Sequence, residues 1–277
     1  MTEQPPQELA AFRALERTAW ETVVGCYAEG FGPLTRQMVA PLLDAVGAQT
    51  GTRLLDVATG PGYVAAAAAA RGARVVGVDF AAAMVALARE RYPTVAFAVG
   101  DAEALAFNAA TFDAVTCNFG ILHLARPDRA LAEAYRVLAP GGRYAFTVWA
   151  SPEQAVGFQL VLRAVEEHGD PRVPLPQGPP FFYYSDPAVA QAALAAVGFV
   201  ECTARLVPLA WHLPTADALF RIMAEGTART AALLRGQTPA ARAAIAAALR
   251  DALAPYERGE GYVVPMAAML AVGRRPG

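Results

Sequence analysis

RLLDVATGPG (residues 53–62) is the stretch of sequence that decides the fold of this chain. Its first half is a short apolar run of the kind that is buried in a parallel sheet. Gly60 and Gly62 then turn the chain into an alanine-rich segment that is expected to be helical. Glycines at such a turn let backbone N–H groups approach a ligand closely, at the positive end of a helix. The stretch therefore predicts a strand, a ligand-binding turn and a helix.

The alternation of short apolar strands and helices continues on both sides of this stretch. Strands are expected at 53–58, 73–79, 95–99, 112–117, 143–149, 199–207 and 262–272, and helices at 7–25, 63–71, 81–91, 127–138 and 187–198. This pattern is typical of an α/β fold with a doubly wound, mostly parallel, seven-stranded sheet, which is Rossmann-like.

Two helical regions lie outside this alternation. Residues 1–48 are expected to form an N-terminal helical cap, and residues 49–277 a Rossmann-like domain. Within that domain, a helical insertion at about 209–257 separates the last two strands, and we expect it to act as a lid over the carboxyl edge of the sheet. Its alanine-rich helices at 215–255 suit either a lid or the surface of a homodimer. Before it, Ser151–Gln154 has the pattern of a capping box that opens a helix.

Composition excludes several classes of function. The 277 residues carry 23 basic and 25 acidic side chains, and the net charge of −2 argues against a nucleic-acid partner. All the basic residues are arginine, so neither a Schiff-base lysine nor a Walker-A lysine is available. The three histidines and three cysteines are scattered, so no metal is expected. With no signal peptide in the N-terminal segment and no membrane-spanning run, we expect a cytoplasmic protein.

Acidic residues lie within the first strand of the sheet, at the end of the second and directly after the third. Asp79 ends the second strand, where a carboxylate can accept hydrogen bonds from both hydroxyls of a ribose. Asp101 follows the third strand, where its carboxylate could accept a hydrogen bond from the amino group of an adenine. Asp56 lies inside the first strand, where it would repel a pyrophosphate but suits a ligand that carries an ammonium and a sulfonium group. Together these residues predict an adenosyl ligand with a cationic tail.

The chain resembles the class I S-adenosylmethionine-dependent methyltransferases, most closely the small-molecule branch of ubiquinone and menaquinone methyltransferases. The segments that carry this resemblance are LLDVATGPG (54–62), VVGVD (75–79), GDAEALAF (100–107), FDAVTCNFGILHL (112–124) and RVLAPGGRYAFTVW (136–149). The resemblance implies S-adenosylmethionine as cofactor, S-adenosylhomocysteine as product, and a last strand that runs antiparallel beside the fifth.

The resemblance also implies residue roles. Asp56, through the turn that it stabilises, and the backbone of Ala58 and Gly60 would face the methionine part of the cofactor, and Asn118 would line its methionine end. Thr59 and Gly62 of the same turn are also expected to bind the cofactor. Asp79 would hold the ribose, and Asp101 and Ala102 the adenine. Three further residues, Phe80, Met84 and Arg36, are expected at the cofactor. Phe80 could stack on the adenine, and Arg36 could form a salt bridge with the carboxylate of the cofactor. Thr59 and Phe80 depart from the residues that are common in the family.

Two other functions remain open at this point. Residues 60–65 also fit G-x-G-x-x-A, so an NAD(P)-dependent oxidoreductase is one alternative, although Asp56 makes it awkward. A non-catalytic protein that binds S-adenosylmethionine is the other. The fourth strand leads into Asn118-Phe-Gly-Ile121 and not into N/D-P-P-Y/F, which disfavours methylation of bases in nucleic acid.

Methyl transfer is an in-line displacement, and it needs alignment and exclusion of water more than it needs an acid–base pair. His123, just past the fourth strand, is the one candidate base, with a structural hydrogen bond as the competing interpretation. Aromatic residues outside the predicted core strands favour a covered pocket for a small, apolar or aromatic acceptor. The candidate acceptor residues are Tyr27, Phe31, Trp149, Phe182, Tyr184 and Trp211.

Overall fold

The computed structural model describes residues 5–277. Residues 1–4, which begin the segment where no signal peptide is expected, lie outside the described residues. The chain forms two compact units. One comprises the described residues up to Leu34 together with Ala150–Gln177 and Pro208–Ala267, and the other comprises Thr35–Trp149, Gly178–Val207 and Ala268–Gly277. The boundaries of these units differ from the expected boundary between residues 48 and 49. The roles of the N-terminal helices as a cap and of the insertion as a lid remain predictions.

The second unit is built on the sheet. Its strands are β1 (Arg53–Val57), β2 (Arg74–Asp79), β3 (Ala96–Val99), β4 (Phe112–Asn118), β5 (Leu138–Trp149), and parts of β6 (Val200–Leu213) and β8 (Gly261–Arg274). The strand order is β3-β2-β1-β4-β5-β8-β6, and the two-residue β7 (Glu257–Arg258) adds to β8 as an eighth strand. The first five strands run parallel, while β8 runs antiparallel to β5. The predicted Rossmann-like sheet and its antiparallel last strand are confirmed.

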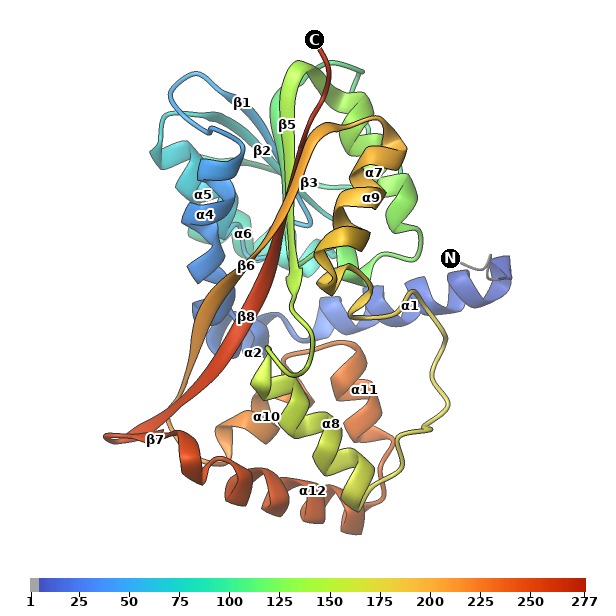
Figure 1. The fold of residues 1–277 in the computed structure, drawn as a ribbon, viewed down its shortest axis with the longest axis vertical. Coiled ribbons are helices and arrows are strands. Elements are labelled where there is room, and N and C mark those ends of the chain that lie inside the picture. Colours follow the sequence, from blue (N-terminus) through green and yellow to red (C-terminus); the bar gives the residue numbers. More distant parts are fainter. Residues whose placement is uncertain (1–4) are drawn as a thin grey trace. The chain divides into compact units, whose positions relative to one another are not determined.

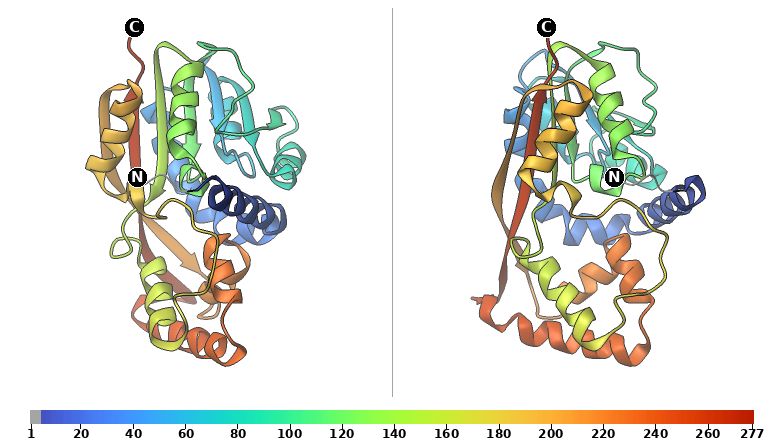
Figure 2. Two further views of the ribbon diagram at one scale, coloured as in Figure 1. Left: turned by 90° about the vertical axis from the view of Figure 1, so that its right-hand side faces the viewer. Right: turned by 45° about the vertical axis from the view of Figure 1, so that its right-hand side comes forward.

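Helices cover both faces of this sheet, as a parallel sheet requires. On one face lie α4 (Val39–Ala45), α5 (Tyr63–Ala70) and α6 (Ala82–Arg91), and on the other α7 (Pro127–Val137) and α9 (Pro187–Val197) (Figure 1). Short helices also belong to this unit, namely η1 (Arg36–Met38), η2 (Ile121–His123) and η3 (Tyr183–Ser185). Figure 2 shows β6 beside β8 at the margin of the sheet.

The sequence explains why these helices begin and end where they do. α7 starts with Pro127 and buries Ala130, Leu131 and Ala134, which share one face at helical spacing. α9 is capped by the Asp186 side chain, which accepts a hydrogen bond from the N–H of Ala188, and it ends at Gly198 in the left-handed region. The buried faces of these helices then pack against the sheet and each other.

The first unit is mainly helical. It contains α1 (Pro6–Thr22), α2 (Val24–Gly30), most of α3 (Gly32–Thr35), α8 (Val156–His168), α10 (Ala218–Glu225), α11 (Arg229–Arg235), α12 (Pro239–Ala252) and η4 (Ala254–Tyr256). Helices α10 to α12 lie between β6 and β8 in the chain, which confirms the predicted helical insertion. No helix among residues 5–277 combines the length and the apolar composition needed to cross a membrane.

The first unit has a core of its own. Glu16 is fully buried on α1 and accepts hydrogen bonds from the side chains of Arg229 at 2.7 Å and Trp20 at 3.1 Å. The guanidinium of Arg229 also lies 4.4 Å from the centroid of the Phe12 ring. A buried charge is tolerated when it is paired and hydrogen-bonded in this way, so these contacts fix α11 against α1.

Candidate functional site

The candidate site lies in the second unit, at the carboxyl ends of the parallel strands. The order β3-β2-β1-β4-β5 places β1 at the centre, with the chain proceeding to β2 and β3 on one side and to β4 and β5 on the other. Ligands of open α/β sheets bind at such a switch point, outside the carboxyl ends of the strands. The residues expected to hold the cofactor come from the ends of β1 to β4, so the topology brings them to one edge.

The backbone after β1 has the tight geometry that its glycines predict. Ala58, Gly60 and Gly62 all have positive φ angles, of 52°, 51° and 84°. A Cβ on Gly62 would lie 2.8 Å from the Phe97 ring, so this glycine allows α5 to pack closely. A Cβ on Gly60 would meet no described atom within 4 Å. Gly60 therefore exposes its backbone to open space, which is where a ligand can approach.

The carboxylate of Asp79 holds this turn. Its two oxygens accept hydrogen bonds from the N–H of Gly60 at 2.8 Å and the N–H of Ala81 at 3.0 Å. Asp79 is buried, so these contacts form in a protected environment. The end of β2 is thus tied to the turn after β1. The structure brings Asp79 and Gly60 together as the sequence predicts.

Asp56 lies beneath the turn and is fully enclosed. Its carboxylate accepts hydrogen bonds from the hydroxyls of Thr59 at 2.5 Å and Thr116 at 2.9 Å. Burial raises the pKa of Asp56 to about 6, against the opposing effect of these hydrogen bonds. The Thr59 side chain is buried and points inward to Asp56, so both residues support the turn from within the sheet.

The segment after β3 presents the adenine candidates. Asp101 is half-buried, and its carboxylate accepts a hydrogen bond from the N–H of Glu103 at 2.9 Å. Glu103 in turn accepts from the N–H of Arg126 at 3.0 Å. Ala102 is buried between them. These contacts fix the loop that carries Asp101 at the sheet edge.

Asn118 ends β4 and connects three segments. Its amide donates to the carbonyl of Thr35 at 3.2 Å, and its Oδ1 accepts from the Thr147 hydroxyl at 2.7 Å. Thr147 also accepts from the N–H of Phe119 at 2.9 Å. Sequence reasoning missed Thr116 and Thr147, because a threonine inside a strand is normally taken as a strand former, and it missed Thr35, which lies in the short helix α3. The position of Thr116 and Thr147 in the last residues of β4 and β5 was the available signal.

Three further candidates surround the turn. Phe80 is half-buried directly after Asp79, and Met84 is almost fully buried in α6, where it is part of the core. Arg36 is exposed, and its guanidinium lies 5.2 Å from the centroid of the Tyr63 ring. Tyr63 is the first residue of α5, so Arg36 is held beside the helix that follows the turn.

The second unit also holds His123 and three of the acceptor candidates. His123 is half-buried in η2, and its ring lies 6.0 Å from that of Phe181. The adjacent Phe182 is half-buried. Trp149 is buried and stacks on Phe119 with a centroid distance of 4.1 Å, and Tyr184 is buried with its ring edge against Phe146. Burial raises the pKa of Tyr184, which therefore stays neutral.

The remaining three acceptor candidates form an aromatic cluster within the first unit. The Phe31 ring lies 4.7 Å from Trp211 and 6.2 Å from Tyr27. Trp211 donates from its indole N–H to the carbonyl of Gly30 at 3.2 Å. Phe31 and Trp211 are buried as core residues, while Tyr27 remains half-exposed. Tyr27 is therefore the most exposed ring of this cluster.

Comparison with known proteins identifies relatives. Residues 55–146 match the methyltransferase domain family. The demethylmenaquinone methyltransferase of Renibacterium salmoninarum is 42% identical over 118 residues, which cover 43% of this chain and 50% of the relative. That of Streptomyces griseus is 33% identical over 167 residues, which cover 59% and 71%. This chain thus spans about half the length of the first relative.

A solved structure shows the same fold. The phosphoethanolamine N-methyltransferase 2 of Haemonchus contortus, in complex with phosphomonomethylethanolamine and S-adenosylhomocysteine, superposes with a TM-score of 0.53. The two proteins are 20% identical, and the match covers 87% of this chain and 53% of the other. At this identity the likeness concerns the fold, and it agrees with the sheet order described above.

Proposed function

The chain belongs to the class I S-adenosylmethionine-dependent methyltransferases, and on this premise we propose that it transfers a methyl group to a small, apolar or aromatic metabolite. The observation that carries the proposal is the contact between the Asp79 carboxylate and the open turn at Gly60. A carboxylate beside a glycine turn at a switch point suits an adenosyl ligand. The carboxylate can accept hydrogen bonds from the ribose hydroxyls, and the glycine turn lets the ligand approach the backbone closely.

The hydrogen-bonding groups around the turn fit S-adenosylmethionine. A ligand with two ribose hydroxyls and an exocyclic amine offers donors, and Asp79 and Asp101 offer carboxylate acceptors at neighbouring strand ends. The open space at Gly60 leaves room for close approach of the methionine part. We propose that Asp79 holds the ribose, Asp101 and Ala102 the adenine, and Gly60 and Asn118 the methionine end. Phe80 and Arg36 complete the proposed set.

Asp56 suits the charge of this cofactor. A buried carboxylate under the turn contributes negative potential where a sulfonium and an ammonium group would lie. The same charge would oppose the pyrophosphate of NAD(P), which weighs against an oxidoreductase. When bound, the cofactor supplies a methyl group that is already activated by its sulfonium. The protein then has to align the acceptor and exclude water, which can lower the barrier by about 7–11 kcal/mol.

The acceptor is proposed from the character of the candidate residues and from the relatives. Phe182 of the second unit is a half-exposed aromatic ring, and such rings bind flat apolar molecules. The relatives named above are demethylmenaquinone methyltransferases, which supports a small-molecule acceptor without fixing the compound. His123 is the proposed base for an acceptor that must lose a proton. The proposed location is the cytoplasm.

A screen of acceptors tests the proposal. The purified chain is incubated with S-adenosylmethionine and a panel of quinols, phenols and aromatic amines, and S-adenosylhomocysteine is quantified by mass spectrometry. We expect product with a subset of aromatic acceptors and none without acceptor. Binding of S-adenosylhomocysteine with no turnover on any acceptor would favour the non-catalytic alternative.

A further inference from the structure

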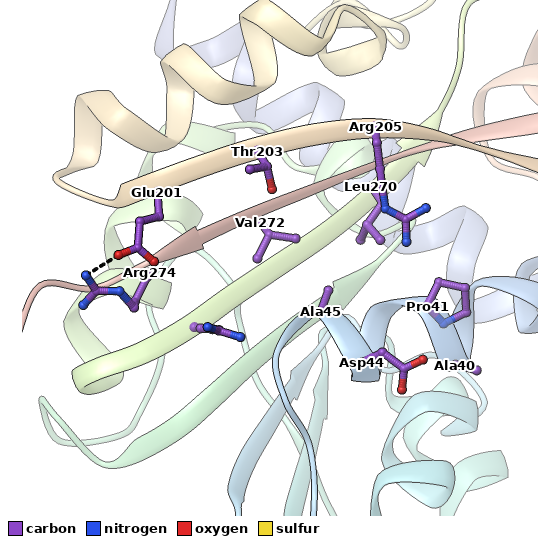
Figure 3. A pocket seen from close by; sticks show the side chains of 11 residues that line it. Ala40, Pro41, Asp44, Ala45, Glu201, Thr203, Arg205, Leu270, Val272 and Arg274 are labelled. Carbon is purple, nitrogen blue, oxygen red and sulfur yellow. Dashed lines mark hydrogen bonds and ion pairs between the residues drawn. The ribbon is translucent and has the colours of Figure 1, made fainter.

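A groove of about 750 Å³ lies on the sheet of the second unit, away from the glycine turn (Figure 3). Side chains of β5, β6 and β8 form its floor, and α4 forms one wall. Its volume is within the range of small-molecule pockets. None of its lining residues belongs to the proposed cofactor site, so the groove needs an explanation of its own.

One end of the groove holds two arginines side by side. Arg143 on β5 lies directly opposite Arg274 on the antiparallel β8. Like charges at directly opposite positions of neighbouring strands repel each other. Glu201 pairs with Arg274 at 2.6 Å, and the pKa of Glu201 is lowered by that hydrogen bond and by the charges of both arginines. Positive charge is therefore in excess at this end.

Glu201 reaches Arg274 from an unusual backbone position. Its φ angle is 53°, in the left-handed region that is costly for a residue other than glycine. Strained backbone conformations of this kind cluster at functional sites. Glu201 thus neutralises Arg274 and leaves Arg143 without an ion pair or hydrogen bond among the described residues.

The other end of the groove holds Arg205. Strands β6 and β8 are antiparallel, since Glu201 contacts Arg274 and Leu213 lies against Gly261. Four residues along β6 from Glu201, Arg205 therefore lies beside Leu270, as Figure 3 shows. The two ends are about 13 Å apart along the strands. The side chain of Arg205 makes no hydrogen bond or ion pair with another described residue, and the carboxylate on the α4 wall, Asp44, is paired with Arg71 at 2.6 Å.

Apolar side chains occupy the floor between the two ends. Val272 faces the groove with Thr203 beside it, and Leu270 follows in the next row, where it is almost fully buried (Figure 3). We propose that this groove binds a small organic dianion, with its acidic groups on Arg143 and Arg205 and its apolar middle over Val272. Arginine suits carboxylates and phosphates because its planar fork can donate two parallel hydrogen bonds.

A titration monitored by NMR tests this proposal. Suberate, an eight-carbon dicarboxylate, is added to full-length protein with ¹³C-labelled leucine and valine methyl groups, and Val272 is assigned through Val272→Ile. We expect saturable shifts of the Val272 and Leu270 signals. Octanoate should bind at least tenfold more weakly because it lacks one charge, and 1-octanol and inorganic phosphate should give no saturable shift.

Matched variants locate the site. Arg143→Gln and Arg205→Gln should each weaken suberate binding at least tenfold, while the exposed Arg163→Gln and Arg235→Gln, which remove the same charge from α8 and α11, should not. Octanoate or 1-octanol binding as tightly as suberate overturns the proposal, as does equal weakening by the control variants. Because binding is the readout and no lining residue belongs to the proposed cofactor site, failure here leaves the methyltransferase proposal intact.

Discussion

The carboxylate of Asp79 accepts a hydrogen bond from the backbone N–H of Gly60 at 2.8 Å, so the end of β2 and the turn after β1 form one unit of the binding edge. Replacing Asp79 by Ala removes this contact and the proposed ribose acceptor. We expect the affinity for S-adenosylhomocysteine to fall at least tenfold, because a hydrogen bond to a charged group contributes about 1.5–3 kcal/mol. Isothermal titration calorimetry measures this.

The control for this change is Asp217→Ala, which removes an exposed carboxylate from the N-terminus of α10. It should leave the affinity for S-adenosylhomocysteine unchanged. If Asp79→Ala binds the ligand as tightly as the control does, the assignment of the ribose to Asp79 is wrong.

Substitutions of Gly60 and Gly47 separate an effect on ligand binding from the cost of backbone strain. Both have positive φ, of 51° and 67°, and a Cβ on either would meet no described atom within 4 Å. Gly60→Ala and Gly47→Ala should therefore each lower the free energy of unfolding by about 1–2 kcal/mol. Only Gly60→Ala should weaken S-adenosylhomocysteine binding, because its new methyl group occupies the space where the ligand approaches. Equal affinities of the two variants would refute this role.

The raised pKa of Asp56 leads us to expect that the protein becomes less stable as the pH rises from 4.5 to 7.5, relative to a variant that lacks this carboxyl group. Its pKa is raised to about 6 in the folded protein by burial, so the folded state binds the proton more tightly than the unfolded state. Its contribution to stability is complete below the unfolded pKa, near 4, and is lost as the pH rises through about 6. Between pH 4.5 and 7.5, the wild-type protein should lose about 2 kcal/mol relative to Asp56→Asn.

Urea denaturation of both proteins at the two pH values measures this difference. Comparison with Asp56→Asn cancels the titration of all other groups, since the variant keeps them. A difference between the proteins that stays constant from pH 4.5 to 7.5, or that changes in the opposite direction, would show that Asp56 is not protonated more readily in the folded state.

His123 is expected to act as a base only when the acceptor has to lose a proton. With a hydroxyl acceptor found in the screen, His123→Ala should lower kcat about 10²–10⁴-fold and leave the affinity for S-adenosylhomocysteine unchanged. His168→Ala, at the exposed end of α8, is the matched control. Unchanged turnover of His123→Ala would mean that alignment alone supports the reaction.

Sequence reasoning located the sheet and the turn because their signals are local. The apolar run before Gly60, the glycine turn itself and the terminal position of Asp79 all depend on neighbours in the chain. It failed at Ser151, where a capping box was expected to open a helix. The helix begins at Val156 instead, because the Ser151 carbonyl accepts from the N–H groups of Gln154 and Ala155 in a preceding turn.

Contacts between distant segments could not be predicted in the same way. The hydrogen bonds of Asn118 to Thr35 and Thr147 join residues 83 and 29 positions apart. The aromatic candidates illustrate the same difficulty, since the periodicity that marks Trp211 as apolar does not tell a core residue from a ligand contact. The structure buries it against Phe31, and such partners depend on tertiary packing alone.

The most direct test of the central claim is the thermal shift of the purified protein with S-adenosylmethionine, S-adenosylhomocysteine, NAD and NADP. A ligand at about 100 times its dissociation constant adds roughly 2.7 kcal/mol to the free energy of unfolding. We predict a rise in Tm with the two adenosyl ligands and none with the two dinucleotides. A rise with NAD or NADP alone would contradict this account and would assign Gly60, Gly62 and Asp79 to a dinucleotide site.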